Sequence, residues 1–419
     1  MTRARVIIFV LWGAVAFAPN AIAQCGSNTA PPTILVGGDK MHCPNAAYST
    51  IQGAVNAASP GQQIRVCAGT YPEQVTIDKS MVLRADDGVF VSPIGMAPNA
   101  VGVTQGDPLA AAFLVMNAAS VEIEGFTVDG SGNGIATCAP RLIGILFQNA
   151  SGRIEHNIVR HFHLSPALPG CQSGNAIEVE TAPGHESDVT IHDNSMDDYQ
   201  ENGITANELG TNANINGNIV IGSGPTTGAA QNGIQIGFGA SGTITNNSIV
   251  NNVWSPCTVI TECVFNATGI LVYQSNGVHI ASNAAGTNQV SVYVGGNDSL
   301  IDVNLLFDSL EGIAVVGNGN SLRLNKIAQS DPAAVFVQGG GNQIASNEIL
   351  GASIGIWEFP GLGRNTQFQN RFFATITPVS LTWSPATNTN NASYDFSSPK
   401  SKIAGNAIPA IQQQVSPSH

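Results

Sequence analysis

A short pattern of apolar and polar positions recurs along most of the chain. Frames such as "IEHNIV", "INGNIV", "IDVNLL" and "IASNEI" share an asparagine at their fourth position. The last four of these asparagines, Asn283, Asn304, Asn325 and Asn347, are separated by 21, 21 and 22 residues. Each frame precedes a second short segment with alternating apolar residues, such as "GILVY" or "GIAVV". Alternation with a period of two predicts short strands with one buried and one exposed face.

The repeat predicts a parallel β-solenoid. Two or three short strands in about 22 residues, closed by a turn with an inward asparagine, are typical of one solenoid coil. Equivalent asparagines should therefore stack about 4.8 Å apart and hydrogen-bond along the axis as a structural amide ladder. The predicted ladder positions are Phe126, Asn157, Asn194, Asn218, Asn247, Asn283, Asn304, Asn325 and Asn347.

A different pattern precedes the repeat, in "YSTIQGAVNAASPG". Ser49 and Gln52 predict a capping box, and Pro60 with Gly61 should end the helix. Between them runs an apolar stripe, formed by Ile51, Ala54, Val55 and Ala58. We expect this short amphipathic helix to cover the open N-terminal end of the solenoid, because an end repeat must protect its strand edges.

The N-terminal segment predicts export. Arg3 and Arg5 precede an apolar run and an "AIA" site, which together describe a cleavable signal peptide over residues 1–23. We therefore expect a secreted or periplasmic protein with no membrane span after cleavage. All seven cysteines lie in the mature part. Seven is an odd number, so at least one cysteine does not pair within the chain.

The overall charge narrows the partners. The formal net charge of -13 argues against nucleic acid or an anionic membrane as a general partner. It also weighs against a polyanionic substrate, unless a local cationic patch or a bound metal compensates. The net charge therefore argues against nucleic acid and anionic membranes as partners, but it does not identify the ligand.

The front segment and the coils together carry a resemblance. The pattern "TIQxAVxAAxPGxxIxVxxGTY" followed by asparagine-turn coils resembles the pectin-lyase-like right-handed parallel β-helix superfamily over roughly residues 48–370. Within it, "YQENGI" and "QNGIQIGFGA" are most similar to secreted bacterial β-helix repeat proteins without an assigned activity. The resemblance implies an all-β, single-stranded right-handed parallel β-helix. That fold supports lyases, hydrolases, epimerases and plain binding proteins, so it selects no activity.

Four inserted segments interrupt the repeat between the ladder asparagine and the next "GI" strand. Regular coils need ten residues there, as from Asn194 to Ile204, whereas the coil after Asn157 takes 20 and the coil after Asn247 takes 23. All four leave the same turn, so they should project from one side and flank the short turn "DDYQE" as the floor of a cleft. Long turns are also tolerated without function. Cysteines could brace the insertions by pairing Cys138 with Cys171 and Cys257 with Cys263.

Alignment of the coils on the ladder predicts the candidate site. Asp129, Arg160 and Asp197 fall in one column, His161 and Asp198 in the next, and Phe162 and Tyr199 in a third. Residues 153–208 also hold five of the eight histidines. The interpretation as an acid/base site competes with plain surface ladders of opposite charge, each worth less than about 1 kcal/mol.

In the catalytic interpretation, each residue has a role. Asp198 and His161 form the acid/base pair, and Arg160 orients an anionic group. Asp197 and Glu201 are further carboxylates on the floor of the cleft. Tyr199 contacts substrate.

Metal ligands are a further hypothesis. Glu178 and Glu180 in "AIEVE" should point outward together and could hold Ca²⁺. Lyases of the resembled superfamily use Ca²⁺, arginine or lysine to neutralise a uronate, and no lysine occurs between Lys79 and Lys326. The pair His161 and His163 could also bind a metal, although no third ligand is evident.

An aromatic row predicts a binding surface. The outward positions of the "GI" strands should stack in one column that becomes aromatic toward the C-terminus, with Tyr293, Phe336 and Trp357 in line and Tyr273 beside them. Such a row suits stacking against sugar rings. Alternatively, the C-terminal segment after residue 370 folds back and covers it.

These patterns predict one exported domain. Its parts are a signal peptide (1–23), a cap with a short helix (24–63), about ten to eleven β-helix coils (64–370) and a C-terminal extension (371–419) whose end lacks fixed structure. The predicted function is binding, with cleavage or epimerisation if catalytic, of an extracellular polysaccharide. The alternative is a non-catalytic surface scaffold or adhesin-like carbohydrate-binding protein.

Overall fold

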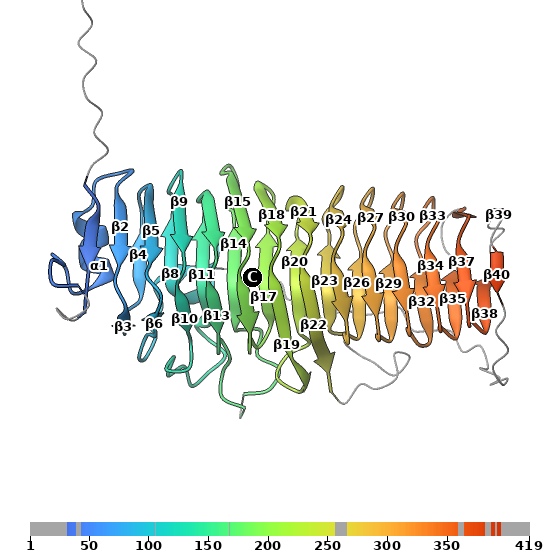
Figure 1. Cartoon of the computed structure of the whole chain (residues 1–419), viewed down its shortest axis with the longest axis horizontal. Helices are drawn as coiled ribbons and strands as arrows, with labels where there is room; N and C mark the ends of the chain where they lie inside the picture. The colour runs from blue at the N-terminus through green and yellow to red at the C-terminus, as the bar shows by residue number, and fades with distance from the viewer. Residues whose placement is uncertain are drawn as a thin grey trace, which may run out of the picture. The chain divides into compact units, whose positions relative to one another are not determined.

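Three long parallel sheets wind around one continuous core. The computed structural model describes residues 32–38, 43–104, 106–166, 168–255, 266–358, 364–381, 387–389 and 392–394. The predicted signal peptide and the pair Cys257 and Cys263 lie outside these residues. Within the unit that begins at Pro32, successive strands pass from sheet A to sheet B to sheet C and back, one coil after another (Figure 1). The prediction of a parallel β-helix is confirmed.

Sheet A has 14 strands. They are, in spatial order, β1 (Ile34–Val36), β2 (Gln63–Val66), β5 (Met81–Ala85), β9 (Val121–Glu124), β12 (Gly152–Glu155), β15 (Ser187–His192), β18 (Thr211–Asn216), β21 (Ser241–Thr245), β24 (His279–Ala281), β27 (Leu300–Asp302), β30 (Ser321–Arg323), β33 (Gln343–Ala345), β36 (Thr366–Phe368) and β39 (Thr387–Thr389).

Sheet B has 13 strands. They are β3 (Gly69–Tyr71), β6 (Val89–Val91), β10 (Thr127–Asp129), β13 (Ile158–Arg160), β16 (Ser195–Asp197), β19 (Ile219–Thr226), β22 (Ser248–Trp254), β25 (Ala284–Gly286), β28 (Leu305–Phe307), β31 (Lys326–Ala328), β34 (Glu348–Leu350), β37 (Arg371–Phe373) and β40 (Ala392–Tyr394).

Sheet C also has 13 strands, of which only β7 (Ala100–Val101) is antiparallel, to β8. The parallel strands are β4 (Val75–Ile77), β8 (Pro108–Met116), β11 (Arg141–Gln148), β14 (Asn175–Glu180), β17 (Asn202–Asn207), β20 (Asn232–Gly237), β23 (Thr268–Tyr273), β26 (Val290–Val294), β29 (Glu311–Val315), β32 (Ala333–Val337), β35 (Ile354–Glu358) and β38 (Thr377–Leu381).

The core consists of stacked aliphatic side chains. In sheet A, the inward residue of each strand lies directly over the inward residue of the next, as Ile154 does over Ile191 and Ile191 over Ile215. All three are fully buried. Apolar side chains stacked in this way bury surface along the whole solenoid, and each coil therefore contributes hydrophobic stabilisation to its neighbours.

The ladder asparagines form an unbroken series of hydrogen bonds. Phe126 N donates to Asn157 Oδ1, and the series then runs through every predicted asparagine and one further residue, Asn370. Asn304 is typical: its N and Nδ2 both donate to Asn325 Oδ1, at 3.0 and 2.9 Å, and Nδ2 also donates to Ile280 O. Each amide thus satisfies backbone and side-chain groups at a buried turn.

The N-terminal cap differs from prediction in its details. Helix α1 (Ile51–Ala57) begins at an N-cap formed by Thr50, whose side chain accepts from Gly53 N, so Ser49 is not the cap. The Glu73 carboxylate accepts from Ile51 N at 2.7 Å and caps the first turn from another element. The predicted apolar stripe is buried, and α1 lies at the N-terminal end of the solenoid (Figure 1).

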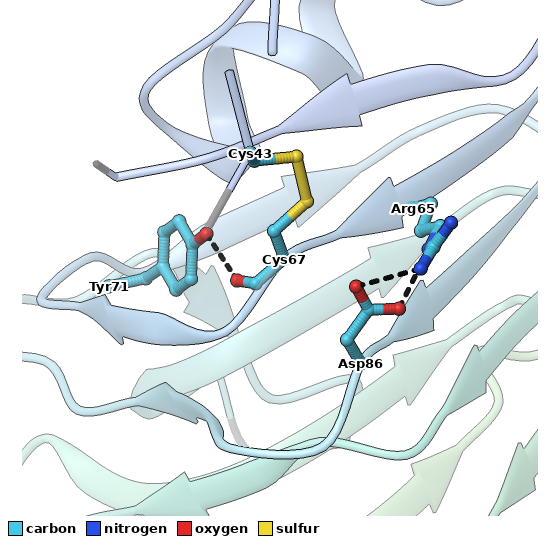
Figure 2. Close-up of a disulfide and its surroundings, with 5 residues drawn as sticks. All are labelled: Cys43, Arg65, Cys67, Tyr71 and Asp86. Atoms are coloured by element: carbon cyan, nitrogen blue, oxygen red, sulfur yellow. Dashed lines mark hydrogen bonds and ion pairs between the residues drawn. A yellow bond between two sulfur atoms is a disulfide. The ribbon is translucent and has the colours of Figure 1, made fainter. Parts of the chain in front are cut away.

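A disulfide that the sequence did not predict braces this end. Cys43 pairs with Cys67, beside the Tyr71 hydroxyl, which donates to the Cys67 carbonyl at 2.7 Å (Figure 2). Arg65 and Asp86 form an ion pair on the neighbouring surface (Figure 2). The cap is therefore tied covalently to the first coil.

The C-terminal boundary at residue 370 was wrong. Strands β37 to β40 continue the three sheets beyond it, with Arg371 opposite Glu348 and Thr377 opposite Ile354. The described residues of this segment therefore add coils at the end instead of folding back over sheet C.

Residues 92–108 cross the outer face of sheet C near its N-terminal end. The Val101 carbonyl accepts from Gln148 Nε2 at 2.7 Å, and Asp107 pairs with Arg141 Nε at 2.7 Å. This contact was not predicted, because the segment belongs to no repeat. It buries outward side chains of β11 and β14, including the carboxylates discussed below.

Candidate functional site

The first three inserted segments leave the same turn of the solenoid, as predicted, whereas most of the fourth lies outside the described residues. The loops that connect sheet B to sheet C over residues 130–140 and 161–174 project from the lower edge in Figure 1. The third insertion instead lengthens a strand, because β19 has eight residues whereas β16 has three. The Cys138–Cys171 disulfide joins the first two loops, which confirms that predicted pairing.

A pocket of about 250 Å³ opens between these insertions. One wall comes from residues 163–169 and includes His163, Pro166 and Leu168. The opposite wall includes Ser223 and Thr226, and the floor is the short turn that begins at Asp198. The predicted cleft over "DDYQE" therefore exists, with long loops on both sides of a short one.

Asp198 owes its position to a left-handed turn. It follows β16 with φ of 50°, as His161 follows β13 with φ of 58°. Aspartate tolerates this conformation better than most residues. The turn directs the Asp198 carboxylate toward the histidines of the preceding coil.

The ion pair in this pocket is His163 with Asp198. Their side chains approach to 3.3 Å between Nε2 and Oδ2, and His163 Nδ1 lies 3.0 Å from Leu164 O. The hydrogen bond to Asp198 raises the pKa of His163 to about 9, with the Leu164 carbonyl adding to the effect. The same bond lowers the pKa of Asp198. The pair is thus charged at neutral pH, with His163 as the proton donor.

The predicted contact of Asp198 with His161 is present, but it is longer than the contact with His163. His161 Nε2 lies 3.9 Å from Asp198 Oδ2, whereas its Nδ1 lies 3.1 Å from Asp129 Oδ1. The predicted column Asp129–Arg160–Asp197 is correct in register, because the three residues pair across β10, β13 and β16.

Arg160 is bound within the protein. Its Nε lies 3.0 Å from Asp129 Oδ2, and it does not line the pocket. Burial raises the pKa of Asp129, but hydrogen bonds from Ser131, His161 and Arg160 outweigh it and bring the pKa down to about 2. Asp129 is therefore an anion that binds both Arg160 and the His161 ring, which leaves Arg160 unsuited to orient an anionic ligand.

Two other predicted residues do not present their side chains to the pocket. Asp197 lies on the outer face of sheet B, opposite Arg160 and Ile221 in the neighbouring strands. The Tyr199 ring is fully buried and its hydroxyl donates to Asn252 Oδ1 at 2.6 Å, so it cannot stack on a substrate. Only the backbone of Tyr199 faces the pocket region, where its carbonyl accepts from Gln231 Nε2.

Glu201 is not on the floor of the cleft. Its carboxylate is buried, neither oxygen has a hydrogen-bond partner, and desolvation raises its pKa to about 8 despite the attraction of Arg141. It lies on the sheet C side of the turn. Its predicted place as an exposed carboxylate was therefore wrong.

The predicted calcium ligands are also buried. Glu178 pairs with Arg141 at 3.3 Å and accepts from Asn175 Nδ2. Glu180 accepts from Gln148 at 2.7 Å, and desolvation together with the Glu178 charge raises its pKa to about 8. A protonated carboxyl and an arginine-paired carboxylate do not fit Ca²⁺, so the predicted pair of exposed ligands was wrong.

In the described part of the chain, one group of acidic side chains brings its oxygens close together. Glu122, Glu124 and Glu155 lie on sheet A with ligand atoms within 4.8 Å of one another. Arg84 pairs with Glu122 and Glu124, and Arg153 pairs with Glu155. Arginine already neutralises this group, and His161 with His163 does not form such a cluster.

The aromatic row exists but is covered. Register places Leu271, Tyr293, Ala314, Phe336 and Trp357 in one column, with Ala314 as a member that the prediction omitted. Tyr293, Phe336 and Trp357 are only 5%, 2% and 7% exposed. Tyr273, in the adjacent column, is partly buried. The predicted open surface for sugar stacking is therefore a buried apolar cluster.

Two larger pockets lack this combination of walls and ion pair. One of about 540 Å³ is lined by Arg65, Arg84 and Asp86, whose charges are paired with one another or with Glu122 and Glu124. The other, of about 440 Å³, contains Asp308 but no cationic side chain among its lining residues. The smaller pocket over Asp198 is the one that combines a wall on each side with an ion pair, so we treat it as the candidate site.

The geometry defines a right-handed parallel β-helix with a loop-walled pocket, and solved structures share that fold. The A-module of a mannuronan C-5 epimerase of Azotobacter vinelandii matches with a TM-score of 0.54 and 14% identity over 82% of this chain and 94% of that chain. A surface adhesin of Streptococcus pneumoniae matches with 0.52 and 14% over 79% and 88%. A lacto-N-biosidase of Eubacterium ramulus matches with 0.53 and 12% over 86% and 68%. At these identities the likeness establishes the fold alone.

A family model, described as periplasmic copper-binding protein (NosD), matches residues 257–407. No curated protein sequence matches the chain. The matched span contains one histidine, His279, two cysteines, Cys257 and Cys263, and no methionine. The periplasmic description agrees with the predicted secreted or periplasmic location. No helix in the described residues is long and apolar enough to span a membrane.

Proposed function

We propose that this protein binds an extracytoplasmic polysaccharide in the pocket over Asp198. The observation that carries the proposal is the pocket itself, where two inserted segments rise on either side of a short turn that bears an ion pair. Loops on a rigid scaffold are a common location for binding sites. The three fold relatives named above include two carbohydrate-active enzymes and an adhesin, which supports the choice of ligand class.

The lining suits a sugar. Hydroxyl and amide side chains, among them Ser223, Thr226 and Gln231, face the apolar side chains of Pro166 and Leu168. A pyranose has hydroxyl groups around its edge and apolar C–H faces, and pockets with a few placed polar groups and apolar walls bind such ligands.

A second candidate function is proton transfer to or from the bound sugar. It is favoured by the contact between His163 and Asp198, which makes His163 an acid at neutral pH. Glycoside hydrolysis is less well supported, because it needs two carboxyl groups about 5–9.5 Å apart across the bond. Asp198 is the only carboxylate among the described lining residues.

The test is a glycan panel with two histidine variants. Calorimetry of the mature protein measures binding, and assays for unsaturated products and new reducing ends, with and without Ca²⁺, measure turnover. We expect His163→Gln to weaken binding by about tenfold or more, because glutamine cannot carry the proton that pairs with Asp198.

His185→Gln is the matched control, since His185 is exposed and outside the pocket. Products that disappear with His163→Gln would establish the catalytic candidate. Equal binding by both variants, or no binding of any glycan, would refute the proposed site.

A further inference from the structure

We infer that the pocket is a blind site that takes one uncharged sugar unit at the end of a glycan chain. This inference deepens the proposed function and rests on it. It adds that the pocket binds the end of a glycan chain and not an internal unit. It also adds that the bound sugar is neutral and not a uronate.

The two walls of the pocket meet on one side. Gly170 N, in the first wall, donates to Gly228 O, in the second, at 2.5 Å. Gly170 adopts φ of 78° in this bridge, a conformation that glycine reaches without strain. A polymer that crossed the cleft from end to end would have to break this bridge.

The floor fixes the same wall. Gln200 Oε1 accepts from Leu164 N at 2.8 Å, and its Nε2 donates to Cys171 O at 2.9 Å. Both ends of the wall are therefore tied to one side chain, and the Cys138–Cys171 disulfide adds a covalent brace. These bonds fix the position of the wall, and a ligand would not easily displace them.

The volume limits what can enter. The pocket of about 250 Å³ lies below the range of about 300–1,000 Å³ that is usual for sites of drug-sized ligands. It therefore has room for a single sugar unit, with the rest of the chain directed outward past the exposed Thr227.

The charges favour a neutral unit. His163 and Asp198 are the only charged side chains among the described lining residues, and they neutralise each other. Arg160 and the His161 ring, in the preceding coil, both contact Asp129. A uronate carboxylate would thus meet Asp198 without a spare cation, and burying an unpaired charge is costly.

The first experiment compares ligands on the wild-type protein. Calorimetry uses the methyl glycosides of glucose, galactose, mannose and xylose, together with glucuronate and galacturonate. We expect at least one neutral glycoside to bind, and its uronate counterpart to bind at least about tenfold more weakly. Equal or tighter binding of the uronates would overturn the assignment of a neutral ligand.

The second experiment counts chain ends. A polysaccharide that binds is compared, at equal mass, with the same polysaccharide cut to shorter chains. We expect the amount of protein bound to rise in proportion to the number of chain ends. Equal capacity per unit mass would show internal binding and overturn the blind-site assignment, while leaving the proposed function intact. If no glycan binds in any form, both fail.

A variant at the mouth tests whether the ligand binds in this pocket. Thr227→Trp fills the mouth of the pocket, and we expect it to weaken glycoside binding by about tenfold or more with an unchanged melting temperature. Thr366→Trp is the control, because Thr366 is exposed on sheet A far along the chain. Binding that survives Thr227→Trp would overturn the inference.

Discussion

Two aspartates occupy the same place in the repeat but have different surroundings. Asp198 follows β16 with φ of 50°, and Asp308 follows β28, four coils further on, with φ of 51°. Asp198 faces His163 across a walled pocket, whereas Asp308 lies in a hollow without a cationic side chain. The turn itself is therefore ordinary, and the inserted loops around Asp198 turn it into a candidate site.

The two regions share the same structural base. Both contain ladder asparagines with matching hydrogen bonds, and both bury the inward residues completely. What differs is confined to the edge where sheet B passes to sheet C. A rigid repeat thus tolerates changes at one turn without disturbing the rest, which is how solenoids support varied functions.

The largest expected effect is common to both regions. Asn194→Ala and Asn304→Ala each remove an amide that satisfies several buried groups, and each unsatisfied group costs about 1–3 kcal/mol. We expect each to lower the free energy of unfolding by at least about 3 kcal/mol, measured by denaturant titration. If Asn194→Ala were much milder than Asn304→Ala, the ladder would not be equivalent in the two regions.

The next effect is a dependence of stability on pH. Desolvation raises the pKa of Glu201 in the cleft region, and of Glu311 in the regular region, to about 8. The unfolded chain releases these protons near its ordinary pKa of 4.5. The folded protein keeps them until about pH 8, so stability falls as pH rises between these values.

We therefore expect Glu311→Gln and Glu201→Gln each to reduce this fall, in unfolding titrations between pH 5 and 8.5. Glycan binding at pH 6 should remain unchanged in both variants, because neither carboxyl lines the pocket. If Glu201→Gln alone lost glycan binding, Glu201 would belong to the binding site after all.

A smaller effect, on glycan affinity, should distinguish the turn at Asp198 from the turn at Asp308. Asp198→Asn keeps a residue that tolerates the left-handed turn but removes the charge that holds His163. We expect glycan affinity to fall about tenfold, or about 1.4 kcal/mol, and the pKa of His163 in NMR titration to fall from about 9 toward its ordinary value. Asp308→Asn makes the same change in the same turn and should alter neither quantity.

The smallest effect concerns Arg160. Its ion pair with Asp129 is half-exposed, and such pairs contribute about 0–1 kcal/mol. Arg160→Gln should therefore lower the melting temperature slightly and leave glycan affinity unchanged. A marked loss of affinity, including for uronates, would restore the anion-orienting role that the sequence predicted.

The fold was predictable because its signal is repeated. Alternating apolar residues and the ladder asparagines report the same local geometry many times, so the inward faces and the vertical register followed directly. The column Asp129–Arg160–Asp197 is an example. Register alone could not show which atoms meet, and so it missed His163 as the nearer partner of Asp198.

The site was less predictable because it depends on non-repeating parts. His163 lies inside an insertion, where alignment to the ladder ends, so only the structure could place it beside Asp198. At Gly203 an added Cβ would meet Val220 Cγ1 in the core, so this position beside the turn needs a glycine that the alternating pattern does not explain. Glu178 was predicted as exposed because the covering segment at residues 92–108 is distant in sequence.

The most direct test of the central claim is a crystal structure of the mature protein with the tightest-binding oligosaccharide. The account predicts one terminal sugar unit between the His163 wall and the Ser223 wall, within hydrogen-bonding distance of Asp198 or His163. An oligosaccharide bound along the outer face of sheet C, or at the hollow beside Asp308, with this pocket empty, would contradict it.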